Sequence, residues 1–509
     1  MFIYLFKQTS STPTLCVNTS SPIITKTATL NMATAKTDLF DTSPLWFRDN
    51  KSELLSPTNI TSSPDVTLLE VIEKSSAFPR KFPIETVRCH QLRTLKIPEN
   101  VLERNINSAY PVIHEHALRL CAMFLTHQKR FGNRQFYQNM SLLELVDRFL
   151  SKRAAFFLGT GDYYMLMDGT VGEGGWENVG TPNELPPLTL ENCLSYDEMK
   201  LSAFLSVSSH TVFVNDGKRD NCGVFEKDRT RIEEDGVIVG LIGTRLTKEN
   251  VMEHREIVKT PTQNTHRYGY GRFCVPTLQG IFSNFYGDSS LTYEEMLSTM
   301  KSSKDRYLGE FYDGSYFDTL VYRRRISLSI DTLLIEANHR AKIINKMAYI
   351  HVVGLGLGVW RLCEEQDEIF MDTFAARLEL LSDVLTNISD VCFAYINHKM
   401  AGNCKHGDKI GNIKLHMVDK SGPHVKLTGE DEGKLLVVSF AWDSNALPGN
   451  EFWEGTLDSS SDPAAACSTQ VAELHNWHIN RKVNAGNLRV ATLKGLVTFQ
   501  EYQKMHAED

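Results

Sequence analysis

Three glycines at alternate positions end an apolar run in residues 349–360, which read Y-I-H-V-V-G-L-G-L-G-V-W. If residues 349–353 form a buried parallel strand, Gly354, Gly356 and Gly358 lie at the carboxyl edge of its sheet, where open α/β sheets bind ligands. Glycines there expose backbone N–H groups and let a diphosphate approach the chain. The spacing matches neither the dinucleotide fingerprint nor the NTPase P-loop. We predict an anion- or nucleotide-binding loop, and the alternative is a tight turn that only permits close packing.

Carboxylate and amide side chains gather in a second segment, residues 439–453, which follows another apolar strand. Asn445 and Asn450 are of a type that holds a ribose by hydrogen bonds, and Asp443 or Glu451 would orient a nucleophile. The alternative is that these side chains only build turns around the Pro-Gly pair between them. Because parallel strands end at one edge of a sheet, we expect this segment and the glycine loop to share a pocket.

A capped helix start follows in residues 461–469, which read S-D-P-A-A-A-C-S-T with proline in the first turn. Backbone N–H groups at a helix N-terminus bind anions. Ser468 and Thr469 are therefore further candidates for ligand binding, and the alternative is a cap without a ligand.

Other polar groups give weaker signals. Residues 205–215 form a Ser- and Thr-rich strand that would act with Glu253 and Glu256 on a sugar hydroxyl or a water, and exposed strand polarity is the alternative. His210 and His351 have no partner at metal-ligand spacing, and the ten cysteines include no zinc-knuckle pair. We expect no metal and no cofactor, with NAD or ADP-ribose only as a substrate or ligand.

The elements that must position the two loops form an α/β pattern in the C-terminal half. Helical spacing predicts a helix that ends near residue 346 with Asp331 as its N-cap, and a second helix at 364–385. Residues 401–433 are expected to be a long loop. Strand, glycine loop, helix and strand in this order indicate a mostly parallel, helix-covered sheet; the strands are predicted at 349–353, 391–395 and 435–440.

The preceding part has a mixed pattern. Helical spacing predicts a helix at 112–125, and a capping box opens another at Ser141. Apolar runs predict strands, and the Ser, Thr and Pro bias of the first residues predicts disorder; the strands are at 154–158, 204–214 and 237–242. The predicted fold class is α/β and α+β in three parts: a disordered tail at 1–75, a mixed α+β lobe at 76–275, and an α/β domain at 276–509 that binds a nucleotide or ADP-ribose.

Composition narrows the classes of partner. The chain of 509 residues has a net charge of −8, which argues against a nucleic-acid partner held by a basic face. No apolar stretch reaches the ~18 residues that a membrane span requires. We expect a soluble, cytoplasmic protein that binds a nucleotide-like small molecule and neither nucleic acid nor membrane.

The glycine loop together with residues 443–453 resembles macrodomain-like ADP-ribose-binding modules, in which glycine-rich loops hold the diphosphate. Here the Asn-bearing loop follows the phosphate loop instead of preceding it, so no macrodomain catalytic asparagine is assigned. The middle lobe is similar to ADP-ribosyltransferases, and the whole chain looks like an uncharacterised family that shares the G-L-G-L-G-V-W and P-G-N-E phrases. These resemblances imply a protein that binds, and as an enzyme would cleave or transfer, an ADP-ribose-like or NAD-derived nucleotide. The alternative is a non-catalytic nucleotide- or protein-binding sensor.

Overall fold

The structure is a computed structural model that describes residues 50–85, 87–271, 277–303, 305–309, 313–419, 422–457 and 460–507. Residues 1–49 of the predicted disordered tail lie outside this described part. From residue 50 the chain is folded, and helix α2 (Leu68–Ser76) begins with a capping box at Thr67. Leu68 and Val71 are buried on the inner face of α2. The Ser- and Thr-rich composition of this stretch obscured its amphipathic helix.

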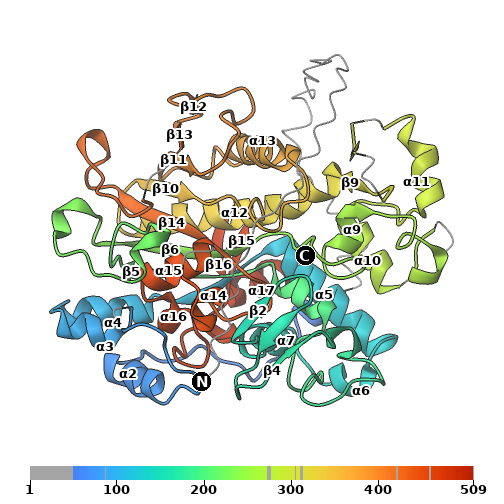
Figure 1. Ribbon diagram of the computed structural model, residues 1–509, viewed down its shortest axis with the longest axis horizontal. Coiled ribbons are helices and arrows are strands. Elements are labelled where there is room, and N and C mark those ends of the chain that lie inside the picture. Colours follow the sequence, from blue (N-terminus) through green and yellow to red (C-terminus); the bar gives the residue numbers. More distant parts are fainter. Residues whose placement is uncertain are drawn as a thin grey trace, which may run out of the picture.

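Within the described residues, a ten-stranded mixed sheet organises the molecule (Figure 1). Its strand order is β12-β13-β11-β10-β14-β6-β5-β1-β15-β16. The strands from β13 to β6 run parallel to one another, whereas β5 runs antiparallel to both β6 and β1. The strands are β1 (Tyr110–His114), β5 (Leu205–Val212), β6 (Asp235–Ile242), β10 (Ala348–Val352), β11 (Ile388–Ala394), β12 (Lys409–Ile410), β13 (Ile413–Val418), β14 (Leu435–Trp442), β15 (Arg489–Thr492) and β16 (Gly495–Thr498).

The central strands form because their apolar runs are buried on both faces of the sheet. Nearly every residue of β6 and of β14 is buried, as is typical of parallel strands covered by helices. The register of this pair joins Val437 to Val237 at one end and Trp442 to Ile242 at the other. The residues that follow, Asp443 and Gly243, therefore emerge beside each other at the carboxyl edge.

Helices cover both faces of the sheet. Helix α12 (Thr319–Ile343) packs against α13 (Glu365–Leu380) and against the central strands, and α15 (Ser461–Ser468) packs against β14 (Figure 1). Alternate residues of β14 belong to different cores: Val437 lies in the main core with α12, and Leu436 and Val438 lie in a second cluster around Phe213. The mostly parallel, helix-covered sheet and the α/β class predicted from the sequence are confirmed.

Shorter elements surround this framework. The remaining strands form two small antiparallel sheets, β2-β3-β4 and β7-β9-β8; they are β2 (Phe156–Leu158), β3 (Tyr163–Met165), β4 (Val171–Glu173), β7 (Val258–Lys259), β8 (Tyr307–Leu308) and β9 (Tyr316–Asp318). The other helices are α3 (Cys89–Thr94), α4 (Glu99–Asn107), α5 (Glu115–Arg130), α6 (Arg134–Tyr137), α7 (Leu142–Ser151), α8 (Tyr196–Ser202), α9 (His254–Ile257), α10 (Leu278–Phe285), α11 (Tyr293–Met300), α14 (Asn450–Glu454), α16 (Val471–Leu474) and α17 (Phe499–Ala507). None of the helices in the described ranges combines the length and apolarity needed to cross a bilayer.

Two helix predictions differ from the structure. The apolar run at 112–125 is split between β1 and α5, because its first residues are buried in the sheet while only the later ones face helical neighbours. Asp331 is not an N-cap; it lies inside α12 and binds Arg377 of α13 through two hydrogen bonds of 2.8 and 2.6 Å. The N-cap of α12 is Asp318, whose carboxylate accepts a hydrogen bond from the amide of Val321.

The segment 401–433, predicted to be a long loop, contains two strands. β13 runs parallel to β11 and extends the sheet, and β12 pairs with β13. Burial alternates along β13, with Ile413, Leu415 and Met417 inside. That period-two signal is present in the sequence, but the low apolar content around it concealed the strand.

The predicted boundary at 275/276 separates strands that share the sheet. β1, β5 and β6 precede this boundary, and the other strands of the sheet follow it. The division into a tail, a lobe and a domain stays a prediction, and the large sheet is common to its last two parts.

Candidate functional site

A cavity of about 580 Å³ lies at the carboxyl edge of the parallel strands. Its wall comes from the glycine loop after β10, from the ends of β14 and β6, and from α15. A cavity of this size suits a ligand as large as a nucleotide sugar. The wall includes the predicted residues Gly354, Gly356, Gly358, Asp443, Glu451 and Ser468.

Glycine is required where two edge loops touch. Gly356 has a φ of 70°, in the left-handed region that favours glycine. A Cβ added at Gly243, directly after β6, would lie 2.6 Å from the backbone nitrogen of Gly356. Gly358 meets neither condition: its φ is not positive, and a Cβ there would meet nothing within 4 Å. The backbone therefore needs a glycine at Gly356, as the tight-turn alternative expects. Gly358 instead leaves open space at the cavity.

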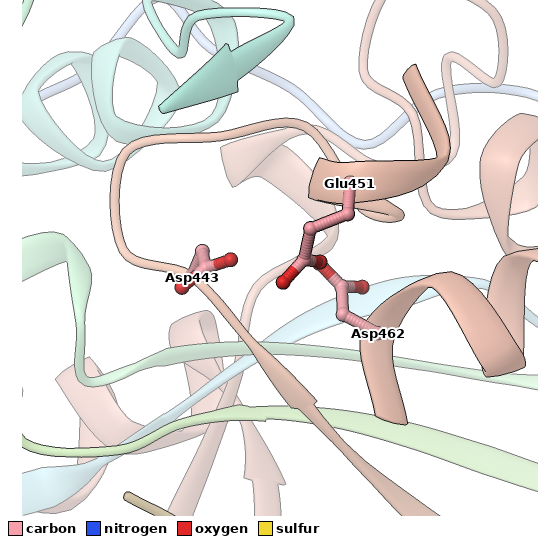
Figure 2. A group of neighbouring side chains, drawn as sticks. All are labelled: Asp443, Glu451 and Asp462. Carbon is pink, nitrogen blue, oxygen red and sulfur yellow. The ribbon is translucent and has the colours of Figure 1, made fainter. Parts of the chain in front are cut away.

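Three carboxylates converge at one point (Figure 2), and two of them, Asp443 and Glu451, line the same cavity as the glycine loop. Asp443 follows the last residue of β14, Glu451 lies in the first turn of α14, and Asp462 lies in the first turn of α15. One oxygen from each carboxylate lies within 4.8 Å of the others. Asp443 and Glu451 are half-buried and Asp462 is buried. Three acidic groups packed this closely repel one another unless protons or a cation compensate them.

Each carboxylate is held by neighbouring groups. Asp462 accepts hydrogen bonds from the backbone amides of Gly449, at 2.7 Å, and of Asn450, at 2.8 Å. The side-chain amide of Asn450 donates to Asp443. The hydroxyl of Ser460 donates to Glu451 at 3.3 Å. These contacts fix the cluster before any ligand binds.

Burial raises the pKa of all three groups, and repulsion within the cluster adds to it for Asp443 and Asp462. Burial, followed by the charge of Glu451, raises the pKa of Asp443 to about 8. Burial raises the pKa of Glu451. Burial and then its two acidic neighbours raise the pKa of Asp462 well above its ordinary value, although the two backbone amides act in the opposite direction. At neutral pH the cluster therefore retains protons, and it can both donate and accept a proton.

Three of the predicted ligand-binding residues lie behind the cavity wall that the described residues form. Asn450 uses its amide oxygen to accept from Phe157 of β2, at 2.8 Å, so it positions Asp443 instead of facing the cavity. The side chain of Asn445 is fully buried, and its backbone carbonyl accepts from Ala154. The hydroxyl of Thr469 donates to the carbonyl of Ala465 within α15. The chain turns sharply between β14 and α14, and this turn directs the side chains of Asn445 and Asn450 inward.

Comparison with known proteins adds an independent finding. Residues 69–505 match the model of the MavL-like ADP-ribosylhydrolases. The chain belongs to this family. It is 41% identical over 454 residues to ADP-ribosylarginine hydrolase CG2909 of Drosophila melanogaster, covering 85% of this chain and 88% of that protein. It is 40% identical over 469 residues to ADP-ribosylarginine hydrolase CG3568 of the same organism, covering 87% and 89%.

Membership of an ADP-ribosylhydrolase family confirms the predicted link to ADP-ribose in its general form. The expectation of an uncharacterised family is not supported, because the matching family has a named activity. The faint likeness of the middle lobe to transferases is not confirmed. The likeness to macrodomains is not confirmed by these comparisons either.

Two cationic residues at the cavity of this ADP-ribosylhydrolase family member were missed in the sequence. Lys218 and Arg219 line the wall from the loop after β5. Lys218 pairs with Asp216 at 2.8 Å, and Arg219 is exposed. The charge of Arg219 acts on Glu451 and favours its ionised form. The local sequence K-R-D is ordinary for a surface loop, and only the pairing of β5 with β6 brings it to the glycine loop.

The middle-lobe carboxylates have structural partners. Glu253 forms an ion pair with Arg325 at 3.1 Å, and Glu256 forms one with Lys200 at 2.8 Å. Both carboxylates are buried. They hold α12 and α8 against α9, and neither lines the cavity of the acidic cluster.

The cluster of Asp443, Glu451 and Asp462 is a set of oxygen donors that suits a hard cation such as Mg²⁺. Both oxygens of Asp462 already accept backbone hydrogen bonds, and Asp443 and Glu451 each accept one more. A cationic group of a substrate would compensate the same charges. The absence of a metal requirement stays a prediction.

Proposed function

We propose that this protein hydrolyses the N-glycosidic bond between ADP-ribose and the guanidinium group of an arginine side chain. The observation that carries the proposal is the cluster of three closely spaced carboxylates, two of which line a cavity with the glycine loop that is large enough for ADP-ribose. Membership of an ADP-ribosylhydrolase family supports hydrolysis, and the two relatives named for ADP-ribosylarginine support arginine as the modified residue.

The cavity is divided by charge in a way that fits this ligand. The diphosphate would lie on the glycine loop, with Gly358 leaving room for it and Arg219 and Lys218 supplying positive charge. This is the arrangement implied by the likeness to macrodomain-like modules. The distal ribose would then lie against Asp443 and Glu451, with the guanidinium beside the acidic cluster.

The proposed reaction moves one proton from water to the leaving group in two transfers, and the cluster can relay it. A water oxygen forms a bond to the anomeric carbon of the ribose as the bond from that carbon to the guanidinium nitrogen breaks. Asp443 and Glu451 orient the water and take its proton, and the same proton passes to the departing guanidine, which leaves as a guanidinium ion. Charge balances, because the substrate and the leaving group each carry one positive charge. The raised pKa of Asp443, about 8, suits a group that exchanges a proton near neutral pH.

The test separates binding from turnover. Asp443→Asn and Glu451→Gln keep the size of each side chain but remove its ability to exchange a proton. We expect each variant to reduce the release of ADP-ribose from an ADP-ribosylated arginine peptide by at least about 100-fold, a typical contribution of acid–base catalysis. The Kd for free ADP-ribose should change by less than about threefold.

A matched control is Glu432→Gln, because Glu432 is an exposed glutamate before β14 that lies outside the cavity wall. Its turnover should equal that of the wild type. Turnover by both cluster variants at the wild-type rate would contradict the catalytic assignment. A wild-type chain that binds ADP-ribose but releases none from the peptide would favour the non-catalytic reader.

A further inference from the structure

A buried arginine behind the cavity wall binds the backbone at Asp443. Arg153 lies in the segment between α7 and β2, and only 3% of its surface is exposed. Its Nη1 donates to the carbonyl oxygen of Ser444 at 2.6 Å and to that of Asp443 at 3.4 Å. Its guanidinium carbon lies 4.3 Å from the centre of the Trp442 ring. One side chain therefore contacts three consecutive residues at the end of β14, and Asp443 is the middle one.

The carbonyl groups that Arg153 binds lie beyond the hydrogen-bonded ladder of the sheet. The register of β14 with β6 ends at Trp442 and Ile242. From Asp443 onward the chain turns toward α14, so its backbone groups need partners from other segments. A guanidinium carries its N–H donors in a rigid plane and can fix two neighbouring carbonyls at once. This contact sets the direction in which the chain leaves the sheet, and with it the direction of the Asp443 side chain.

The other donors of Arg153 anchor it to two helices. Its Nε donates to the carbonyl of Phe149 in α7 at 2.8 Å, and its Nη2 donates to that of Ser202 in α8 at 3.2 Å. Both carbonyls lie in the last turn of their helices, where a cation is favourable. The hydroxyl of Ser202 also donates to the carbonyl of Ser444, at 2.9 Å. The turn after β14 is thus tied to the carboxyl ends of α7 and α8.

Charge compensation distinguishes Arg153 from the other buried arginines. The described residues include seven buried arginines, and six of these form an ion pair with a carboxylate: Arg119, Arg148, Arg245, Arg325, Arg340 and Arg377. The hydrogen bonds that Arg153 makes within the same ranges all go to backbone carbonyls. Burial lowers the pKa of Arg153 to about 9, so the group is still charged at neutral pH. A buried charge without an opposite charge costs stability, so this arginine is best explained by the turn that it holds in place.

We propose that Arg153 is a positioning residue for the hydrolysis, because it fixes the backbone of Asp443 and Ser444 so that the Asp443 carboxylate faces Glu451 and the reacting water. This inference rests on the proposed function, since it names a residue on which the proposed chemical step depends. Arg153 does not touch the ligand and acts through Asp443. Asn450 holds the same carboxylate directly, so the backbone and the side chain of Asp443 are each held by one polar residue.

Arg153→Lys tests the proposal, since lysine keeps the charge but lacks the planar group that binds both carbonyls. We expect kcat for the release of ADP-ribose from an ADP-ribosylated arginine peptide to fall by at least about tenfold, because small displacements of a reacting group are costly. The Kd for free ADP-ribose should change by less than about threefold, because Arg153 lies outside the cavity wall. Thermal melts establish that the variant is folded at the assay temperature.

A double-mutant cycle with Asp443→Asn distinguishes positioning from a general loss of structure. If Arg153 acts through Asp443, Arg153→Lys should reduce kcat by less than about twofold in a chain that already carries Asp443→Asn. An equal loss of kcat in both backgrounds would mean that Arg153 only maintains the fold, and it would overturn the proposal.

The matched control is Arg340→Lys. Arg340 is also a buried arginine that donates to two backbone carbonyls, those of Ser108 and Ser208, but it pairs with Glu336 and is not part of the cavity wall. Its substitution should lower the Tm and leave kcat unchanged, because its partners lie away from the turn after β14.

Ser202→Ala is a milder probe of the same turn, because it removes only the hydroxyl that binds the carbonyl of Ser444. We expect it to reduce kcat by about threefold with a Tm close to that of the wild type. Wild-type kcat in Arg153→Lys, or in Ser202→Ala if Arg153→Lys does not fold, would overturn this inference and leave the proposed function intact. A wild-type chain that releases no ADP-ribose from the peptide would contradict the proposed function and this inference together.

Discussion

At the acidic cluster, folding stability and function conflict. The cluster consists of Asp443, Glu451 and Asp462. Three acidic groups with oxygens within 4.8 Å of one another oppose folding, because burial and mutual repulsion disfavour their ionised forms. The backbone amides of Gly449 and Asn450 and the side chain of Asn450 hold them together nevertheless. Strain that the surrounding structure enforces in this way is expected where a ligand or a reaction uses it.

This conflict predicts how stability depends on pH. The folded-state pKa of Asp443, about 8, exceeds its unfolded value of 3.8, so its contribution to stability is complete below pH 3.8 and is lost as the pH rises through 8. Asn at this position resembles the protonated Asp and cannot ionise. We expect Asp443→Asn to match the wild-type Tm at pH 4 and to exceed it by about 3 °C or more at pH 8.5.

The measurement is a series of thermal melts of both proteins between pH 4 and pH 8.5 without ligand. Asp408→Asn is a suitable control, because Asp408 lies in the exposed turn before β12, remote from the cavity wall. A gap between the Asp443→Asn and wild-type melting temperatures that does not widen with pH would refute the explanation.

At the scale of elements, the loop between β10 and α13 combines a glycine that the backbone needs with one that the backbone does not need. Gly356 has a φ of 70°, and Gly358 has neither a positive φ nor a neighbour within 4 Å of an added Cβ. Substitutions at these two positions therefore distinguish a structural role of the loop from a role in ligand binding.

We expect Gly358→Val to weaken ADP-ribose binding by about tenfold or more with a Tm within about 1 °C of the wild type, because its side chain would occupy space left for the diphosphate. Gly356→Val should instead lower the Tm by several degrees, because a β-branched residue is strained at positive φ. Calorimetric titration and thermal melts of the two variants check both statements. Wild-type affinity in Gly358→Val would argue against a diphosphate on this loop.

The sequence sufficed for the elements whose signal is local. The apolar runs of β10 and β14 and the glycines after β10 predicted parallel strands and a shared carboxyl edge, and the structure places Gly354, Gly358, Asp443 and Glu451 around one cavity there. The apolar run of β6 predicted a strand, but not its place beside β14. Local signals did not show which way a side chain points. Asn450 matches a ribose ligand by type, yet the turn into α14 aims it at Asp443 and β2.

Other parts of the site depend on contacts between distant segments and could not be predicted. Lys218 and Arg219 reach the cavity because β5 pairs with β6 and β6 pairs with β14. The sequence showed of His351 only that it has no partner at metal-ligand spacing, and its place in the cavity wall follows from the pairing of β10 with β14. The sequence indicated only that Asp462 lies at the start of a helix. Its place in the cluster follows from the packing of α15 against α14.

At the scale of the whole molecule, the large sheet interleaves the two predicted parts of the chain. β6, β5 and β1 come from residues before 276, and they lie between two groups of strands from residues after it, β12-β13-β11-β10-β14 on one side and β15-β16 on the other. The site is interleaved in the same way, because the glycine loop and the acids follow residue 276 whereas Gly243 and Arg219 precede it.

This interleaving predicts that neither part folds alone. In a fragment of residues 276–509, β14 would lose β6 and β15 would lose β1, leaving two unpaired inner edges and apolar faces without a common sheet. We expect fragments 50–275 and 276–509 to show no cooperative thermal transition by circular dichroism and to bind a hydrophobic dye, whereas residues 50–509 melt in one transition. Co-expression of the two fragments should restore a complex that melts cooperatively, because the strand pairings are then available in trans. A cooperative melt of isolated 276–509 would instead establish it as an independent domain, and the cavity would then need a wall other than the one that β6 supplies.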